Sequence, residues 1–223
     1  LWTNFDDKKT LGIRDIRVAV RRLRHFARTG TPDEFDLNGT ISATANNGGY
    51  LDVKMMPERK NRVKLLLFLD VGGSMDPYIQ ACEELFSASK SEFKDLEHFY
   101  FHNCPYEILW KNNPRSSEDI ISTWDIIRKY GSDYRVLFVG DASMSPYEVA
   151  YAGGSIEHWN EEAGSVWLER ITSHFDSVAW LNPETKKIWN SSASNKMIRE
   201  IFEEKMYEMN LSGIEEAMKA LSR

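Results

Sequence analysis

The chain has 223 residues, a hydrophobic content of 42% and a formal net charge of −6. This length allows one large domain or two small ones, and the apolar content is enough to bury a sizeable core. No apolar run approaches the roughly 20 residues needed to cross a bilayer, so we expect a soluble protein without a membrane span. The net acidity disfavours nucleic acid as a partner of the main body.

The chain ends and the cysteines set further expectations. No secretory signal opens the sequence, so the cytoplasm is the expected location, although a start at Leu1 leaves room for an upstream segment. Cys82 and Cys104 have neither the number nor the spacing of a disulfide framework or a zinc knuckle, and we expect both in the core. The five His residues are scattered, which argues against transition-metal catalysis.

Residues 12–28 predict an amphipathic basic helix. Its arginines form either a solvated face on a docked helix or a contact for an acidic partner. Residues 28–49 are rich in Gly, Asn, Thr and Asp, which predicts a loop with at most short extended pieces. We therefore divide the chain into an N-terminal helix with its linker, 1–49, and a main domain, 50–223. The apolar stripe of the helix comprises Ile13, Ile16, Val20, Leu23 and Ala27, and the basic stripe comprises Arg14, Arg17, Arg21, Arg24 and Arg28.

Strands and helices alternate from residue 50 onward. Continuous apolar runs are typical of strands covered on both faces. Short connections between such strands and intervening helices predict a doubly wound α/β fold, with a mostly parallel sheet and helices on both faces. The expected strands are 63–70, 98–104, 106–111, 134–141 and 177–182, and the expected helices are 77–90, 116–131, 164–175, 194–208 and 211–222.

Two of these strands end in similar loops, "FLDVGGSMDPY" and "FVGDASMSPYE". In the first, we expect Asp76 to cap the following helix; in the second, Ser145 and Glu148 have the spacing of a capping box. Asp70 and Asp141 remain at the strand ends, where no helix needs them. Ligands of such folds bind at the carboxyl ends of the strands, so we expect these two carboxylates to meet there.

Two converging carboxylates are costly without a cation. Asp70, Ser74 and Asp141 offer the oxygen ligands that a small hard ion such as Mg²⁺ prefers. Gly72 and Gly73 let the turn bend tightly and let the backbone approach the ion. The simpler alternative is that both aspartates are turn residues without a ligand.

The combination resembles a known family. A hydrophobic strand, "DVGGSM", a helix, a later Thr and a strand ending in "GDASMS" are similar to the von Willebrand factor A-type (VWA) domain. That family carries a metal-ion-dependent adhesion site with the motif D-x-S-x-S and a distant Thr and Asp. The stretches "LNGTISATANNGGYLDVKM" and "VAWLNPETKKIW" resemble its CoxE-like branch, whose bacterial members are often paired with MoxR-type AAA+ ATPases.

The resemblance implies site residues position by position. Asp70 matches the aspartate of the motif, Ser74 its second serine and Asp141 the late aspartate. Gly72 stands where the first serine is expected, so one hydroxyl ligand is absent. Either water replaces it, the ion binds more weakly, or the site has lost its metal.

The threonine of the family is best matched by Thr123 in "STWDII", which precedes the strand bearing Asp141. An ordinary helical threonine is the competing interpretation. Other hydroxyls nearby are rivals for the same role, namely Ser116, Ser117 and Ser122.

An ion held by neutral hydroxyls and waters keeps much of its charge and an open coordination position. In the family, a Glu or Asp of a partner protein fills that position. The resemblance therefore implies a protein-binding module that depends on Mg²⁺ or Mn²⁺, and an adaptor to a MoxR-type ATPase in assembly or metal insertion of a client complex.

Two other functions compete with this one. A haloacid-dehalogenase-like phosphatase would use Asp70 as nucleophile, but it needs a second acid two residues later, where Gly72 stands. A metal-free interaction scaffold stays open because of that same glycine. We expect a binding protein and not an enzyme.

Overall fold

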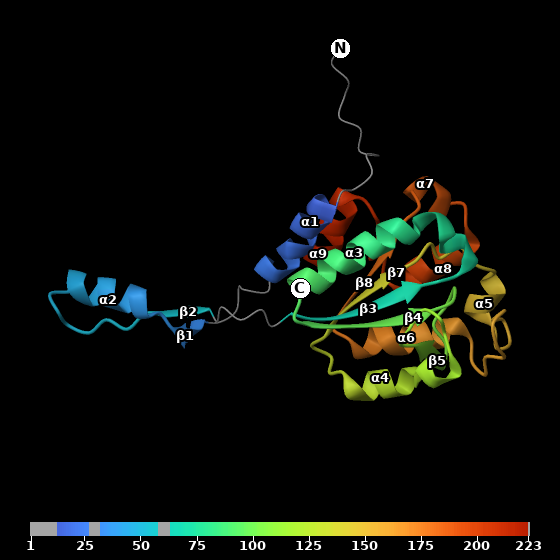
Figure 1. Ribbon diagram of the computed structural model, residues 1–223, viewed down its shortest axis with the longest axis horizontal. Helices are drawn as coiled ribbons and strands as arrows, with labels where there is room; N and C mark the ends of the chain where they lie inside the picture. The colour runs from blue at the N-terminus through green and yellow to red at the C-terminus, as the bar shows by residue number, and fades with distance from the viewer. Residues whose placement is uncertain (1–12, 27–31, 58–62, 223) are drawn as a thin grey trace, which may run out of the picture.

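The computed structural model describes residues 13–26, 32–57 and 63–222. Its centre is a seven-stranded sheet of order β6-β5-β4-β3-β7-β8-β9 (Figure 1). The five strands β4, β3, β7, β8 and β9 run parallel, whereas β5 pairs antiparallel with both of its neighbours. The strands are β3 (Lys64–Asp70), β4 (Asp95–Phe101), β5 (Ile108–Trp110), β6 (Ile120–Ser122), β7 (Arg135–Val139), β8 (Ser177–Asn182) and β9 (Met206–Glu208). The predicted mostly parallel α/β fold is confirmed.

Helices cover both faces of this sheet (Figure 1). α1 (Ile13–Phe26), α3 (Ile79–Glu92) and α9 (Leu211–Leu221) share a core with one face. α4 (Thr123–Lys129), α6 (Gly164–His174) and α8 (Ala193–Ile201) share a core with the other. Shorter helical segments are η1 (Gly73–Tyr78), η2 (Ser117–Asp119), α5 (Pro146–Ala150) and α7 (Lys186–Trp189). None of the helices in the described residues is long and apolar enough to cross a membrane.

The two faces of the sheet differ in the kind of side chain that they bury. The face toward α1, α3 and α9 is aliphatic, with Leu, Val and Ala from the central strands. The opposite face is aromatic. There Phe138 lies between Phe68 and Trp180, with ring centroids 4.6 Å and 5.2 Å away. Such ring pairs each add about 0.5–1.5 kcal/mol beyond the area they bury, so the three central strands are strongly fixed to one another.

The basic helix α1 docks on the main domain. Ile16, Ala19 and Val20 are buried in the aliphatic core. Arg21 pairs with Glu92 of α3 at 2.9 Å, and Arg22 pairs with Glu215 of α9 at 2.7 Å. Two arginines of the helix therefore serve contacts within the chain. Ala27 and Arg28 of the predicted stripes lie outside the described residues, as do the side chains of Ile13, Leu23 and Arg24.

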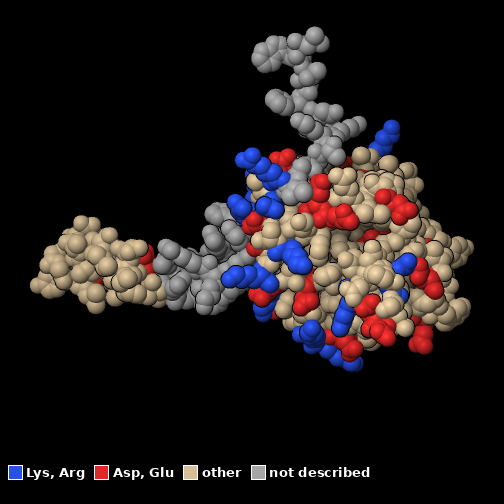
Figure 2. Space-filling view, viewed as in Figure 1, with Lys and Arg blue, Asp and Glu red and all other residues tan. Residues whose placement is uncertain are grey.

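The prediction of a loop over 28–49 is wrong for most of its length. β1 (Pro32–Phe35) pairs antiparallel with β2 (Met55–Pro57), and α2 (Leu37–Asn46), which lies between them in the sequence, packs beyond the end of the pair (Figure 1). Asp36 caps α2, because its Oδ1 accepts a hydrogen bond from the Gly39 N–H at 2.9 Å. A good N-cap thus starts a helix in a sequence whose Gly, Thr and Asn content favours loops. Few charged side chains are visible on the face of this unit that Figure 2 shows. The proposed boundary after residue 49 stays a prediction.

Two predicted helices each contain a strand instead. Residues 116–131 form η2, the edge strand β6 and only then α4, since Ile120 and Ile121 pair with β5. Residues 194–208 form α8 and then β9, where Met206 and Tyr207 pair with β8. β-branched and aromatic residues at a free sheet edge gain more from pairing than from continuing a helix.

Candidate functional site

The two strand-end aspartates come from neighbouring strands. β3 and β7 run parallel, with Leu69 aligned to Val139, so Asp70 and Gly140 both lie at the carboxyl edge of the sheet. Gly140 packs directly on Asp70: a Cβ on this glycine would lie 2.8 Å from the Asp70 Cβ and 3.1 Å from its Oδ2. Only a glycine allows this approach, and Asp141 follows it. The structure thus brings the two predicted carboxylates to one edge.

The Asp70 carboxylate is buried and only half satisfied. Its Oδ1 accepts hydrogen bonds from the backbone N–H groups of Gly72 and Asn103, both at 2.9 Å. Its Oδ2 is buried and has no hydrogen-bond partner among the described residues. Burial, together with the negative charges of Asp141 and Glu148, raises the pKa of Asp70 to about 7, against the two backbone hydrogen bonds. A positive charge is therefore missing beside this oxygen.

The described residues around Asp70 supply no such charge. Neither Asp70 nor Asp141 forms an ion pair in the part of the chain that the structure describes. A further carboxyl, that of Glu184, has its pKa raised by burial and by the charge of Asp141, and the Tyr78 hydroxyl donates to it at 3.4 Å. The edge is an accumulation of acidic groups, which favours binding of a cation.

Asp141 is held in a closed loop. It is 2% exposed, and its Oδ1 accepts a hydrogen bond from the Ser143 N–H at 2.8 Å. Its backbone carbonyl accepts from the Asn182 amide at 2.8 Å. The predicted capping box follows and is confirmed: Ser145 Oγ accepts from the Tyr147 N–H, and the Glu148 carboxylate accepts from the Ser145 N–H.

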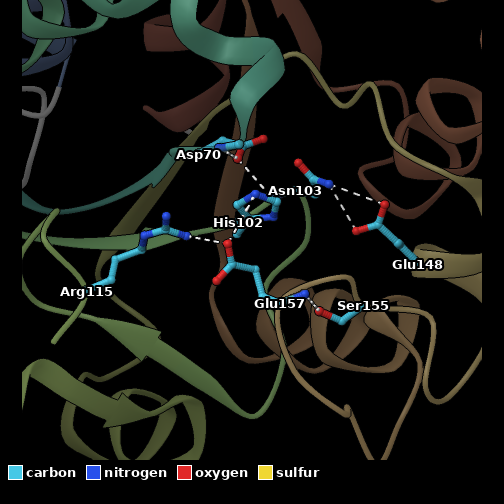
Figure 3. Close-up of polar contacts among 8 residues, drawn as sticks. Asp70, His102, Asn103, Arg115, Glu148, Ser155 and Glu157 are labelled. Carbon is cyan, nitrogen blue, oxygen red and sulfur yellow. Dashed lines mark hydrogen bonds and ion pairs between the residues drawn. The ribbon is translucent and has the colours of Figure 1, made fainter. Parts of the chain in front are cut away.

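Asn103 joins the two loops and was missed by the sequence analysis. Its backbone N–H binds Asp70, and its side-chain Nδ2 donates to both carboxylate oxygens of Glu148, at 3.1 and 3.3 Å (Figure 3). Its φ of 58° lies in the left-handed region, which Asn tolerates better than most residues. An Asn two residues after the strand "HFYF" was the available signal. Glu148 therefore has two roles, as helix cap and as anchor for this amide.

Ser74 lies on the first turn of η1 and is exposed. It borders an open cavity of about 680 Å³ that is rich in hydroxyl, amide and carboxylate groups. Asp70 borders a second cavity of about 270 Å³, between η1 and α3, together with Val71, Gly72 and Met75. The turn at Gly72 and Gly73 thus separates the hydroxyl of Ser74 from the cavity that Asp70 borders. The other polar residues of the larger cavity are His102, Asn103, Ser143, Ser145, Glu148 and Ser192.

The structure does not bring Thr123 to either cavity. The residue is fully buried at the start of α4, and its hydroxyl donates to the Tyr106 carbonyl. Its N–H donates to the Glu107 carbonyl at 2.9 Å. Of the rival hydroxyls, that of Ser116 donates to Asp119 at 2.7 Å. The hydroxyl of Thr123 is therefore used within the fold.

The prediction that Asp76 caps a helix is wrong. The chain forms the 3₁₀ segment η1 before α3 begins at Ile79, so Asp76 lies inside a helical turn instead of ahead of it. Neither η1 nor α3 has a side-chain cap. The helix after β3 starts without the local hydrogen bonds that close the helix after β7.

The donor set fits a hard cation better than a soft one. No group of three or more His, Cys, Asp or Glu residues is placed to hold a metal within residues 13–26, 32–57 and 63–222. What the edge offers instead is an unpartnered buried carboxylate oxygen and neutral hydroxyl and amide oxygens. Oxygen ligands with few carboxylates suit Mg²⁺ or Mn²⁺ with several retained waters.

Comparison with known proteins gives one match. The family model described as "VWA domain containing CoxE-like protein" matches residues 11–107. The matched segment includes Asp70, Ser74 and Asn103, whereas Asp141 lies beyond it. No curated protein and no solved structure matches the chain.

Proposed function

The chain is a CoxE-like VWA-domain protein, and from this premise we propose that it binds an acidic side chain of a partner protein through a divalent cation at the carboxyl edge of its sheet. The observation that carries the proposal is the buried Oδ2 of Asp70, for which the described part of the chain offers no hydrogen-bond partner and no ion pair. A buried carboxylate in this state costs several kcal/mol unless a cation compensates it.

The residues at the carboxyl edge have different roles in binding the proposed cation. Asp70 and Asp141 supply negative charge, and Ser74, which lies across the Gly72–Gly73 turn from Asp70, supplies a neutral hydroxyl from the side of the larger cavity. This set can hold Mg²⁺ or Mn²⁺ without neutralising the ion. A bound ion would supply an open coordination position for a carboxylate oxygen. The exposed position of Ser74 leaves that side of the edge accessible to a partner. Thr123, whose hydroxyl is used in the fold, is left out of the proposed ligand set.

The partner in this proposal is a protein with an accessible Glu or Asp. Resemblance to the CoxE-like branch suggests a MoxR-type AAA+ ATPase, with the chain acting as adaptor in assembly or metal insertion of a client complex. The proposed role is binding and not catalysis. A metal-free scaffold is the competing role, and Gly72 in place of a motif serine is the observation that favours it.

Calorimetric titration with MgCl₂ and MnCl₂ tests the cation site. The wild type is expected to bind one ion, and Asp70→Ala to weaken binding by at least about tenfold, as loss of a metal-supporting group typically does. Asp176→Ala is the matched control, because Asp176 is an exposed carboxylate that contacts Ser132. Equal heats for the wild type and Asp70→Ala would favour the metal-free scaffold.

Water-proton relaxation with Mn²⁺ tests the open position. A short peptide with a single Glu is expected to lower the relaxation enhancement of the protein–Mn²⁺ complex, because its carboxylate displaces bound water. The same peptide with Gln is the control. Identical effects of the two peptides would contradict recognition of an acidic side chain.

A further inference from the structure

The glycine at position 72 is not required by the backbone. Its φ of −59° and ψ of 152° lie in a region that every L-residue adopts. A serine would therefore be tolerated there as far as main-chain conformation is concerned. The reason for a glycine must be sought in the space around it.

That space is filled by Asn103. A Cβ added to Gly72 would lie 2.2 Å from the Asn103 Oδ1, a distance that real Cβ atoms do not show. The same point lies 3.2 Å from the Asp70 Oδ1. The amide oxygen of Asn103 thus occupies the volume in which the side chain of a serine at position 72 would begin, directly beside the carboxylate of Asp70.

The amide is held in one orientation. Its Nδ2 donates to both oxygens of Glu148, so the carbonyl oxygen points away from Glu148, toward the side on which Asp70 lies (Figure 3). Asn103 is 8% exposed, and no described donor makes a hydrogen bond to its Oδ1. Asn103 borders the larger cavity, so this oxygen is free to accept a ligand from that side. The neighbouring Oδ2 of Asp70 is buried and has no partner among the described residues.

We propose that Asn103 supplies, through its Oδ1, the neutral oxygen ligand that the absent serine at position 72 would have supplied. The inference rests on the proposed cation site and names one more of its ligands. An amide oxygen is neutral, as a hydroxyl is, so the exchange leaves the charge of the edge unchanged. Asn amide oxygens are established ligands of hard cations. Glu148 acts as a positioning residue, because it fixes which atom of the amide faces Asp70.

Four proteins test the exchange: wild type, Asn103→Gly, Gly72→Ser, and the double variant. Glycine at 103 keeps the left-handed backbone accessible while it removes the amide. Asn103→Gly is expected to weaken Mn²⁺ binding about tenfold, as loss of a supporting group does. Gly72→Ser is expected to weaken binding similarly and to lower the melting temperature in EDTA, because its Cβ collides with the Asn103 Oδ1.

The double variant is the decisive protein. With the amide gone, the serine fits and its hydroxyl returns to the edge, so Mn²⁺ affinity is expected to recover to within about threefold of the wild type. Its melting temperature in EDTA is expected to exceed that of Gly72→Ser. A purely structural role for Asn103 would instead make the two Mn²⁺ losses add.

Two controls separate other causes. Glu203 is another residue with a positive φ, 51°, and its side chain is exposed. The Mn²⁺ affinity of Glu203→Gly is therefore expected to match that of the wild type. The Cβ of a residue at position 73 would meet nothing within 4 Å, so Gly73→Ser is expected to have the same melting temperature as the wild type. Unchanged Mn²⁺ binding in Asn103→Gly would overturn this inference alone, provided that Asp70→Ala weakens Mn²⁺ binding as proposed above. A wild type that binds no Mn²⁺ would overturn both proposals.

Discussion

The loops after β3 and β7 have nearly the same sequence plan and opposite hydrogen-bonding outcomes. After β7, the carbonyl of Asp141 accepts a hydrogen bond from Asn182, and a capping box at Ser145 closes the next helix. After β3, the Oδ2 of Asp70 has no partner, and the next helix has no side-chain cap. Two loops that look alike in sequence therefore differ in how many of their polar groups the fold itself satisfies.

The difference indicates that the two loops have different roles at the carboxyl edge. The loop after β7 satisfies its backbone carbonyl at Asp141 and its helix start at Ser145 within the fold. The loop after β3 leaves a buried polar atom and a helix start unsatisfied, and natural proteins keep such defects mainly where a ligand removes them. Two kinds of variant test this contrast. One removes hydrogen bonds from the loop after β7, and the other removes the unpaired carboxylate from the loop after β3.

The largest effect on stability is expected from opening the loop after β7. Asn182 is fully buried; its amide donates to the carbonyl of Asp141 and to Asn195, and its Oδ1 accepts from the Glu184 N–H. Asn182→Ala leaves these buried groups unpaired, which is expected to lower the free energy of unfolding by about 3 kcal/mol. Urea unfolding followed by circular dichroism measures it.

Asn190→Ala is the matched control for that measurement. Asn190 is exposed and accepts one hydrogen bond from Arg199, so its loss is expected to cost less than about 0.5 kcal/mol. Equal costs for the two asparagine variants would show that the loop after β7 does not depend on its buried network.

A smaller, pH-dependent effect is expected from relieving the loop after β3. The folded-state pKa of Asp70, about 7, lies above its ordinary value of 3.8, so the folded protein holds this proton more tightly than the unfolded chain. The corresponding stability is complete below pH 3.8 and is lost as the pH rises to about 7. Asp70→Asn removes this titration.

In EDTA, the stability of Asp70→Asn relative to the wild type is therefore expected to rise by about 2–3 kcal/mol between pH 5 and pH 8. Urea unfolding at the two pH values measures this difference, and other titrating groups cancel in the comparison. A relative stability that does not change with pH would mean that folding does not raise the pKa of Asp70.

The smallest effect is expected at the two helix starts. Ser145→Ala removes a cap from α5 and is expected to cost about 1 kcal/mol. Asp76→Ala, at the corresponding point of the other loop, is expected to change the free energy of unfolding by less than about 0.5 kcal/mol, since Asp76 caps no helix. A loss of 1 kcal/mol in both variants would contradict the contrast between the loops.

Much of the fold could be predicted because its central strands carry their own signal. Runs such as "VKLLLFLD" are apolar on both faces, and only a sheet covered by helices buries both. The edge strands β6 and β9 could not be predicted in this way. They have three residues each and follow or precede genuine helices, so pairing with a neighbour decides their conformation, and a neighbour is not visible in a local window.

The candidate site was predictable only in part, for a related reason. Asp70 and Asp141 follow strands, and parallel strands bring their ends together by topology. Asn103 lies 33 residues after Asp70, and its side chain matters because it fills the space beside Gly72. A motif search detects the missing serine but not the atom that replaces it, since replacement is a matter of volume between distant segments.

The difference between the two faces of the sheet also fixes the register of its central strands, and with it the positions of the residues at the carboxyl edge. Phe68, Phe138 and Trp180 are aligned across three strands, and a slip by one residue would turn their rings toward the aliphatic side. There the helices contribute small residues to the core, among them Ala19 and Ala88, and the central strands contribute Leu, Val and Ala. Packing of the aromatic rings thus fixes the register of the three central strands. That register in turn fixes how far apart the acidic groups at the strand ends lie.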